Sequence, residues 1–221
     1  MATLIFDYDG TLHDAIRIYA PAFRKACAWL EERGLLEPRE WSDARVSRWL
    51  GQTSVAMWAD FHPELGEGDR LMAEGIILDE MKRRIQEGLA WWYPGAVEVL
   101  RELKGEGHRL VFLSNCTLAY MEAHQGAFGL EGFFEAFYPG EAWGFRPKHE
   151  IFPSIRERFG TEETYLMIGD RHHDMDVGVV HGIGRVGCLY GYGPMEELHG
   201  ADRLVRDVRE IPLAVRGLLN R

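Results

Sequence analysis

Two carboxylates stand two residues apart, directly after a short apolar run near the start of the chain. The run covers residues 3–6, and the acids Asp7 and Asp9 follow it, with Gly10 and Thr11 next. A short apolar run closed by a glycine turn is typical of a buried parallel strand, and open α/β sheets bind ligands outside the carboxyl ends of such strands. Because side chains at i and i+2 of an extended segment point to the same side, we expect both acids to face one site. Gly10 permits a sharp turn, and Thr11 offers a hydroxyl and an N–H to an oxyanion. The alternative is an Asx turn that merely ends a strand.

Two later apolar runs, residues 110–113 and 165–168, end in polar residues of the same kinds. The residues that follow them are Ser114 and Asn115 after the first run, and Gly169, Asp170 and Asp174 after the second. Between these runs, the loop 144–152 carries the cations Arg146 and Lys148. Since the carboxyl ends of parallel strands share one edge of a sheet, all these side chains are predicted to converge on one crevice.

The order and types of these residues resemble the haloacid dehalogenase-like (HAD) hydrolase superfamily. Its four signature motifs are matched by Asp7-Tyr8-Asp9-Gly10-Thr11, by Ser114, by a Lys or Arg at 146–148, and by Gly169-Asp170 with Asp174. The tail from Asp174 to Gly193 is similar to that of phosphoglycolate phosphatase-like members. The resemblance therefore covers nearly the whole chain.

The resemblance implies a Mg²⁺-dependent site. Asp7 would be the nucleophile that forms an aspartyl-phosphate, and Asp9 would protonate the leaving oxygen and later deprotonate water. Mg²⁺ would be held by the metal ligands Asp7, Asp9 (through its backbone carbonyl) and Asp170, with Asp174 holding a water or orienting Lys148. A cluster of acids without a cation is unfavourable because the charges repel one another. The expected phosphate-binding residues are Gly10, Thr11, Ser114, Asn115 and Arg146.

The third motif leaves two choices for the catalytic cation. Some members read Lys-Pro-x-Pro-Glu-Ile-Phe, which aligns Arg146 with the lysine, whereas others read Lys-x-Glu-Ile, which selects Lys148. We favour Lys148, because a compact ammonium is a common point-charge partner of a phosphoryl group and it is the only lysine in the loop.

The periodicity of the chain divides it into two parts. Residues 14–93 carry helical patterns, with a long helix expected at about 69–91 and helix starts at Ser42 and at Thr53 or Ser54. From residue 94 onward helices alternate with short strands, which predicts parallel βαβ units. We therefore expect an α/β Rossmann-like parallel sheet with helices on both faces (residues 1–13 and 94–221) plus a small all-helical cap domain (14–93), as in family members with a cap between motifs one and two. Hinges are predicted near residues 13–14 and 92–94.

Charge and cysteine content limit the partners. The 221 residues carry a formal charge of −10, which argues against nucleic acid or an anionic membrane, since these need clustered cations. The three cysteines give no disulfide framework and are typical of reduced thiols in a cytoplasmic protein. No apolar stretch reaches the roughly 20 residues of a membrane span. The expected partner is a small phosphorylated metabolite, bound by a monomer or homodimer.

The functional prediction is a Mg²⁺-dependent phosphatase. A phosphomutase resembling β-phosphoglucomutase is the closest alternative, because it shares all four motifs and differs mainly in its cap. A phospho-accepting signalling module is disfavoured by the second acid, Asp9, and by the helical insertion. The identity of the phosphoester stays open, because specificity is expected to lie in the cap.

Overall fold

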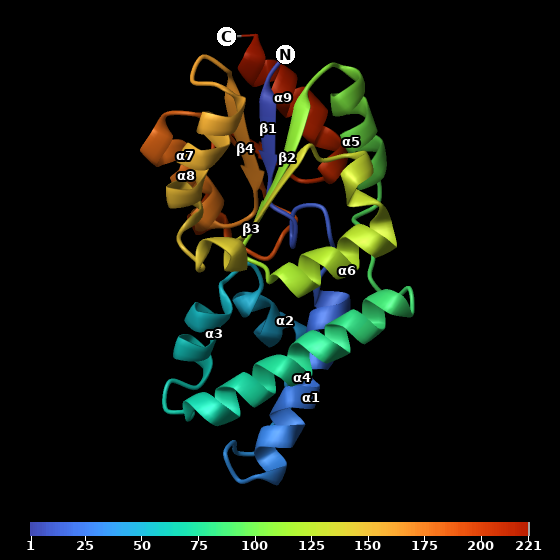
Figure 1. Ribbon diagram of the computed structural model, residues 1–221, viewed down its shortest axis with the longest axis vertical. Coiled ribbons are helices and arrows are strands. Elements are labelled where there is room, and N and C mark those ends of the chain that lie inside the picture. The colour runs from blue at the N-terminus through green and yellow to red at the C-terminus, as the bar shows by residue number, and fades with distance from the viewer. Residues whose placement is uncertain (221) are drawn as a thin grey trace.

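A parallel six-stranded sheet forms the centre of the upper part of the molecule in Figure 1, a computed structural model that describes residues 1–220. The strands are β1 (Thr3–Phe6), β2 (Arg109–Ser114), β3 (Ala136–Pro139), β4 (Tyr165–Gly169), β5 (Gly184–Cys188) and β6 (Arg203–Val205), in the order β3-β2-β1-β4-β5-β6. Ile5 of β1 lies opposite Val111 of β2 and Met167 of β4. The strand that precedes the first acids is therefore central and has hydrogen-bonded neighbours on both edges.

Helices cover both faces of the sheet, because the apolar side chains of its central strands point alternately to the two sides. Leu4 and Phe6 of β1 face a core shared with α5 (Ala96–Gly105) and α9 (Ile211–Leu219). Ile5 faces a second core shared with α7 (Lys148–Phe159) and α8 (His172–His181). The predicted Rossmann-like α/β fold is confirmed.

The helical part lies below the sheet in Figure 1 and is inserted between β1 and β2. It consists of α1 (Ile16–Glu32), α2 (Asp43–Val46), α3 (Ser54–Phe61) and α4 (Glu67–Gln86). Ser42 and Thr53 begin α2 and α3 as expected, because their side chains accept the N–H groups of Arg45 and Ala56. A helical cap is thus present, while its exact bounds at 14 and 93 stay a prediction.

The two chain crossings between the cap and the sheet lie side by side. The N–H of Asp14 donates to the carbonyl of Trp91 over 2.9 Å, and that of Tyr93 donates to the carbonyl of Leu12 over 2.8 Å. His13 and Trp92 form an antiparallel bridge between them. The cap is therefore joined to the core by one short, hydrogen-bonded pair of segments.

Two expectations about the elements are wrong. Helix α4 ends at Gln86 and not near Trp91, because Gly88 adopts φ +73° and the N–H of Leu89 donates back to the carbonyl of Arg84, which is a glycine-terminated helix end. Strand β6 was not expected, since it has only three residues and Leu204 is exposed, so no apolar run marks it.

The remaining helix of the core, α6 (Leu118–Phe128), follows β2 and lies against α4 of the cap. Within residues 1–220, no helix is long and apolar enough to cross a membrane.

Candidate active site

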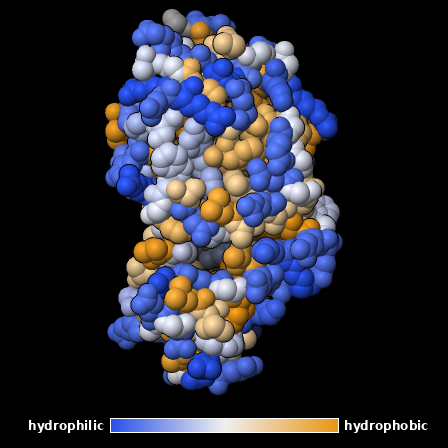
Figure 2. Space-filling model, in the orientation of Figure 1, coloured by the Kyte–Doolittle hydropathy of each residue, from blue (hydrophilic) through white to orange (hydrophobic). Residues whose placement is uncertain are grey.

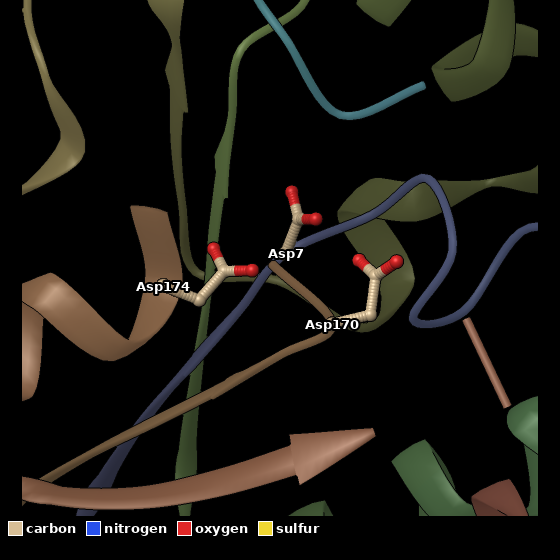
Figure 3. Close-up of side chains that lie close together, drawn as sticks. All are labelled: Asp7, Asp170 and Asp174. Atoms are coloured by element: carbon tan, nitrogen blue, oxygen red, sulfur yellow. The ribbon is translucent and has the colours of Figure 1, made fainter. Parts of the chain in front are cut away.

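Three carboxylates meet at the carboxyl ends of the central strands. Asp7 follows β1, Asp170 follows β4, and Asp174 lies in the first turn of α8. One oxygen from each lies within 4.8 Å of the others, and all three side chains are buried. Figure 3 shows them gathered from these three segments, which are far apart in the sequence. The predicted convergence of motifs one and four is thus present in the structure.

Lys148, the first residue of α7, lies among these acids. Its Nζ donates to Asp7 Oδ1 over 2.6 Å and to Asp174 Oδ1 over 2.7 Å, and the side chain is 2% exposed. The other oxygen of Asp7, Oδ2, is buried and has no hydrogen-bond partner among the described residues. The Asp7 carboxylate is therefore fixed at one oxygen and free at the other.

Burial and mutual repulsion govern the charges of this cluster. Burial raises the pKa of Asp7 well above its usual range, although Lys148 opposes the shift. Burial, followed by the charge of Asp174, raises the pKa of Asp170 to about 7. Burial disfavours the charged form of Lys148 as well, but Asp174 and Asp7 outweigh it and raise the pKa of the ammonium above its usual value. One ammonium thus leaves the three acids short of positive charge, which a bound cation would supply.

Two backbone N–H groups of one loop and a hydroxyl of another contact Asp170. Its Oδ2 accepts the N–H of Tyr192 over 2.6 Å and that of Gly193 over 3.4 Å, while the Thr11 hydroxyl lies 3.5 Å from Oδ1. Gly10 has φ +87°, and a Cβ at this position would collide with the Asp170 carboxylate. The glycine after the second acid is therefore required both by its backbone conformation and by the close approach of Asp170.

Asp9 is held apart from the three clustered acids. Its Oδ1 accepts the hydroxyl of Tyr120 over 2.8 Å and lies 2.8 Å from Nδ1 of the buried His13. The buried ring of Tyr8 stacks on His13, and the Tyr8 hydroxyl accepts Trp92 Nε1–H. Sequence reasoning missed His13 and Tyr120 as partners of Asp9. The spacing of four residues offered a weak signal for His13, and nothing local indicated Tyr120.

The remaining predicted residues lie at different depths. Ser114 is buried at the end of β2, and the side-chain amide of Asn115 donates to the carbonyl of Gly51 in the cap over 2.9 Å. Arg146 is exposed in the loop before α7, and the cation that contacts the acids is Lys148. Arg171 pairs with Glu197 over 2.7 Å and donates to the carbonyl of Leu50 in the cap, and its positive charge opposes the rise in the pKa of Asp170.

A cavity of about 360 Å³ opens between cap and core beside these residues. Asp9, Ser114 and Asn115 line its core end. Its cap end is lined mainly by apolar side chains of the cap: Tyr19, Trp49, Leu50, Met57, Trp58, Leu71, Ile77, Leu78 and Met81. In Figure 2 the molecule is hollowed between its upper and lower parts, and hydrophobic residues border the hollow.

The parallel sheet, the helical cap and the acids at the carboxyl ends of the central strands together define a Rossmann-like enzyme. Comparison with known proteins gives its family. The model of the haloacid dehalogenase-like hydrolase family matches residues 4–188. The chain belongs to this family, as the motifs in its sequence implied. It is accordingly a hydrolase.

Individual relatives are phosphatases. The chain is 27% identical to a phosphoglycolate phosphatase of Mesorhizobium japonicum over 86% of its own length and 83% of the relative. It is 32% identical to a 5′-nucleotidase of Pseudomonas aeruginosa, with 88% and 86% covered. Among solved structures, one described as a predicted phosphatase from Clostridium acetobutylicum superposes with a TM-score of 0.82 at 21% identity, covering 98% of this chain and 99% of that one. The chain is a phosphatase of the family in this broad sense.

Replacing Lys148 should reveal the electrostatic strain of the acid cluster. In Lys148→Met, Asp7 and Asp174 lose their counter-charge, so the folded-state pKa of Asp7, already raised by burial, rises further above its value in the unfolded chain. A raised carboxyl pKa leaves stability intact at low pH and reduces it as pH rises. Removing one partner of a buried ion pair costs about 3–5 kcal/mol. We expect a loss of this size in urea unfolding at pH 8 and a clearly smaller one at pH 5.5.

Lys82→Met, a substitution on cap helix α4, serves as the control and should show no such dependence on pH. An equal loss at both pH values for Lys148→Met would mean that the lysine contributes packing and not charge.

Proposed function

We propose that this protein is a Mg²⁺-dependent phosphatase that hydrolyses a small phosphorylated metabolite through an aspartyl-phosphate on Asp7. The observation that carries the proposal is the state of the Asp7 carboxylate. One oxygen accepts a hydrogen bond from Lys148, and the other is buried beside Asp170 and Asp174 with no hydrogen-bond partner among residues 1–220. An unpartnered buried carboxylate oxygen is costly unless a ligand completes the site.

The residues fit a hard divalent cation. Mg²⁺ prefers carboxylate and carbonyl oxygens, and we assign Asp7, Asp170 and the backbone carbonyl of Asp9 as its protein ligands, with Asp174 supporting them. When bound, Mg²⁺ would offset the negative charge of the phosphoryl group and of the acids. The raised pKa of Asp170, caused first by burial and then by the charge of Asp174, supports this assignment, because a cation beside it would stabilise the charged carboxylate.

The reaction then follows from the positions of the side chains. A carboxylate oxygen of Asp7 attacks phosphorus, and the bond between phosphorus and the leaving oxygen breaks while Asp9 donates a proton to that oxygen. Water next attacks the phosphorus of the acyl phosphate, and Asp9 accepts a proton from it. Inorganic phosphate leaves, and the Asp7 carboxylate is regenerated.

The phosphoryl oxygens need donors that are already in place. We assign this role to Lys148, to the hydroxyls of Ser114 and Thr11, and to the backbone N–H of Asn115. A phosphate-binding role for Gly10 stays a prediction with less support, because its N–H donates to the carbonyl of His13 over 2.9 Å. The burial of Lys148 beside Asp7 supports it as the cation of the third motif. A phosphate-binding role for Arg146 stays a prediction with less support, because its side chain is exposed.

The cap would close the site during each turnover. We propose that residues 14–93 move as one body relative to residues 1–13 and 94–221, with hinges at the paired segments near His13 and Trp92. Contacts of Asn115 with Gly51 and of Arg171 with Leu50 would then break and re-form. We further propose a cytoplasmic monomer or homodimer, consistent with three free cysteines.

A phosphomutase of the same family is the remaining alternative, since it would use the same acids. The relatives named above hydrolyse different esters by their names, a phosphoglycolate and a 5′-nucleotide, so they do not identify the substrate. Product analysis with a sugar phosphate separates the two functions: a phosphatase releases inorganic phosphate, and a mutase returns an isomeric sugar phosphate.

Substituting the two acids of the first motif tests the mechanism. Asp7→Asn should lower kcat by at least about a thousandfold, because an amide is a poor nucleophile and carries no charge. Asp9→Asn, assayed with an aryl phosphate whose leaving group needs no proton, should form the phosphoenzyme but hydrolyse it slowly, so mass spectrometry should detect phosphate on Asp7.

Asp176→Asn is the control, because this acid lies on α8 near Asp174 but outside the cluster. Asp7→Asn activity within tenfold of the parent would rule out Asp7 as the nucleophile.

Magnesium binding should weaken as the pH falls below neutrality. With a pKa of about 7 in the metal-free protein, Asp170 is increasingly protonated below pH 7, and Mg²⁺ must displace that proton. Protonation of Asp170 alone should therefore make the affinity fall by up to about tenfold per pH unit below 7, and the raised pKa of Asp7, the other carboxylate ligand, should steepen the fall. Isothermal titration calorimetry between pH 6 and 8 measures this.

Asp170→Asn is the matched control, which should bind Mg²⁺ more weakly and with a smaller pH dependence. A dissociation constant that is the same at pH 6 and pH 8 in the parent would contradict the assignment of Asp170 as a ligand.

A further inference from the structure

The cavity beside the acids contains no positive charge of its own. Of the described residues that line it, none is a lysine, arginine or histidine. Three are acids, Asp9, Glu74 and Glu141. Arg70, one turn before Glu74 on α4, is not among the lining residues, and its Nη1 is already paired with Glu74 over 2.9 Å.

The cap end of the cavity is apolar and aromatic. Trp49, Met57 and Trp58 are almost fully buried there, and the core adds Tyr120 and the half-buried Phe145. An apolar wall gains free energy by excluding water from an apolar ligand. An anionic ligand would instead lose its hydration with no counter-charge to replace it.

This arrangement separates the two ends of a bound phosphoester. Lys148 and the donors around Asp7 receive the phosphoryl group, and the leaving group must then extend past Asp9 into the cavity. A volume of about 360 Å³ is within the range of small-molecule pockets. The cavity therefore contacts the leaving group and not the phosphoryl group, so it selects substrates by the chemistry of the leaving group.

We propose that the substrate is a phosphomonoester whose leaving group is uncharged and carries an apolar ring, and that esters with an anionic leaving group are poor substrates. The proposal rests on the phosphatase function proposed above. Phosphoglycolate and pyrophosphate have anionic leaving groups, so both should be poor substrates of this chain.

A matched pair of substrates isolates the charge. The leaving groups of 4-carbamoylphenyl phosphate and 4-carboxyphenyl phosphate have nearly the same shape and differ by one negative charge. With saturating Mg²⁺, kcat/KM should be at least about tenfold higher for the carbamoyl ester, since the carboxylate would face acids in a partly desolvated cavity. A carboxyphenyl ester hydrolysed as well as or better than its carbamoyl partner would overturn the proposal.

A second pair isolates the ring. Both 2-phenylethyl phosphate and ethyl phosphate have alkoxide leaving groups, so they differ mainly in the apolar area that the cavity can bury. The phenylethyl ester should show the higher kcat/KM, chiefly through a lower KM. Equal values would show that the apolar wall does not contact the leaving group.

A charge reversal at Glu74 tests whether this cavity is responsible. Glu74→Lys places a cation in the lining, which should move the ratio of kcat/KM values at least about fivefold toward the carboxyphenyl ester. The ratio of the two kcat/KM values is compared between the parent and the variant, so the different intrinsic reactivity of the two leaving groups cancels. Asp79→Lys makes the same change at an exposed position of α4 outside the lining and should leave the ratio unchanged.

The same shift in both variants would assign the effect to overall charge and overturn the role of the cavity. If thermal denaturation shows that Glu74→Lys does not fold, Glu74→Gln gives the same test with a smaller shift in the same direction.

Binding of non-hydrolysable analogues separates this proposal from the proposed function. Calorimetry compares 4-carbamoylphenylphosphonate with 4-carboxyphenylphosphonate in the presence of Mg²⁺. Selective binding of the neutral analogue, without hydrolysis of any ester, would overturn the phosphatase function but support the charge preference of the cavity. Hydrolysis of the esters together with equal binding of both analogues would retain the phosphatase and overturn the preference.

Discussion

The contact of Lys148 with Asp7 and Asp174 is the interaction on which the rest of the site depends. Three buried carboxylates within 4.8 Å of one another repel strongly in a region of low dielectric. Lys148 neutralises part of this charge, and the N–H groups of Tyr192 and Gly193 support Asp170. Two features of the cluster remain uncompensated. Oδ2 of Asp7 has no hydrogen-bond partner among the described residues, and burial together with the charge of Asp174 keeps the pKa of Asp170 raised. We therefore propose that this edge of the sheet binds a cation and, beside it, a phosphoryl group.

The local features of this arrangement could be predicted from the sequence. Apolar runs that end in Asp7, Ser114 and Asp170 indicate strands with polar carboxyl ends, and parallel pairing brings those ends together wherever they lie in the chain. The choice between Lys148 and Arg146 could not be made from spacing alone, because it depends on where α7 begins. Since α7 starts at Lys148, that side chain is buried against the acids while Arg146 stays in the exposed loop. Similarly, β6 is defined by pairing with β5 and not by its own composition.

Contacts that join distant parts of the chain were beyond sequence reasoning. Tyr120, on α6, donates to Asp9 across 111 positions, and His13 binds the same carboxylate from the segment that leads into the cap. The backbone of His13 also pairs with Trp92, where the chain returns from the cap. The acid that we assign to proton transfer is therefore anchored to the segment that we propose as the hinge. A shift of the cap at this hinge would act directly on the position of Asp9, whereas Asp7 is anchored to the sheet.

The division between a charged core edge and an apolar cap cavity also limits how selective the enzyme can be. In the proposed function, the core would bind the phosphoryl group through charge and hydrogen bonds that every phosphomonoester can satisfy. The cap offers mostly apolar contacts, and one methylene in such a pocket changes transition-state binding by only about 1–3 kcal/mol. Strong rejection should therefore come from charge, since an anion in the cavity would meet no cation among the described residues that line it. It follows that this chain should discriminate sharply between neutral and anionic leaving groups but only modestly among neutral ones of similar size.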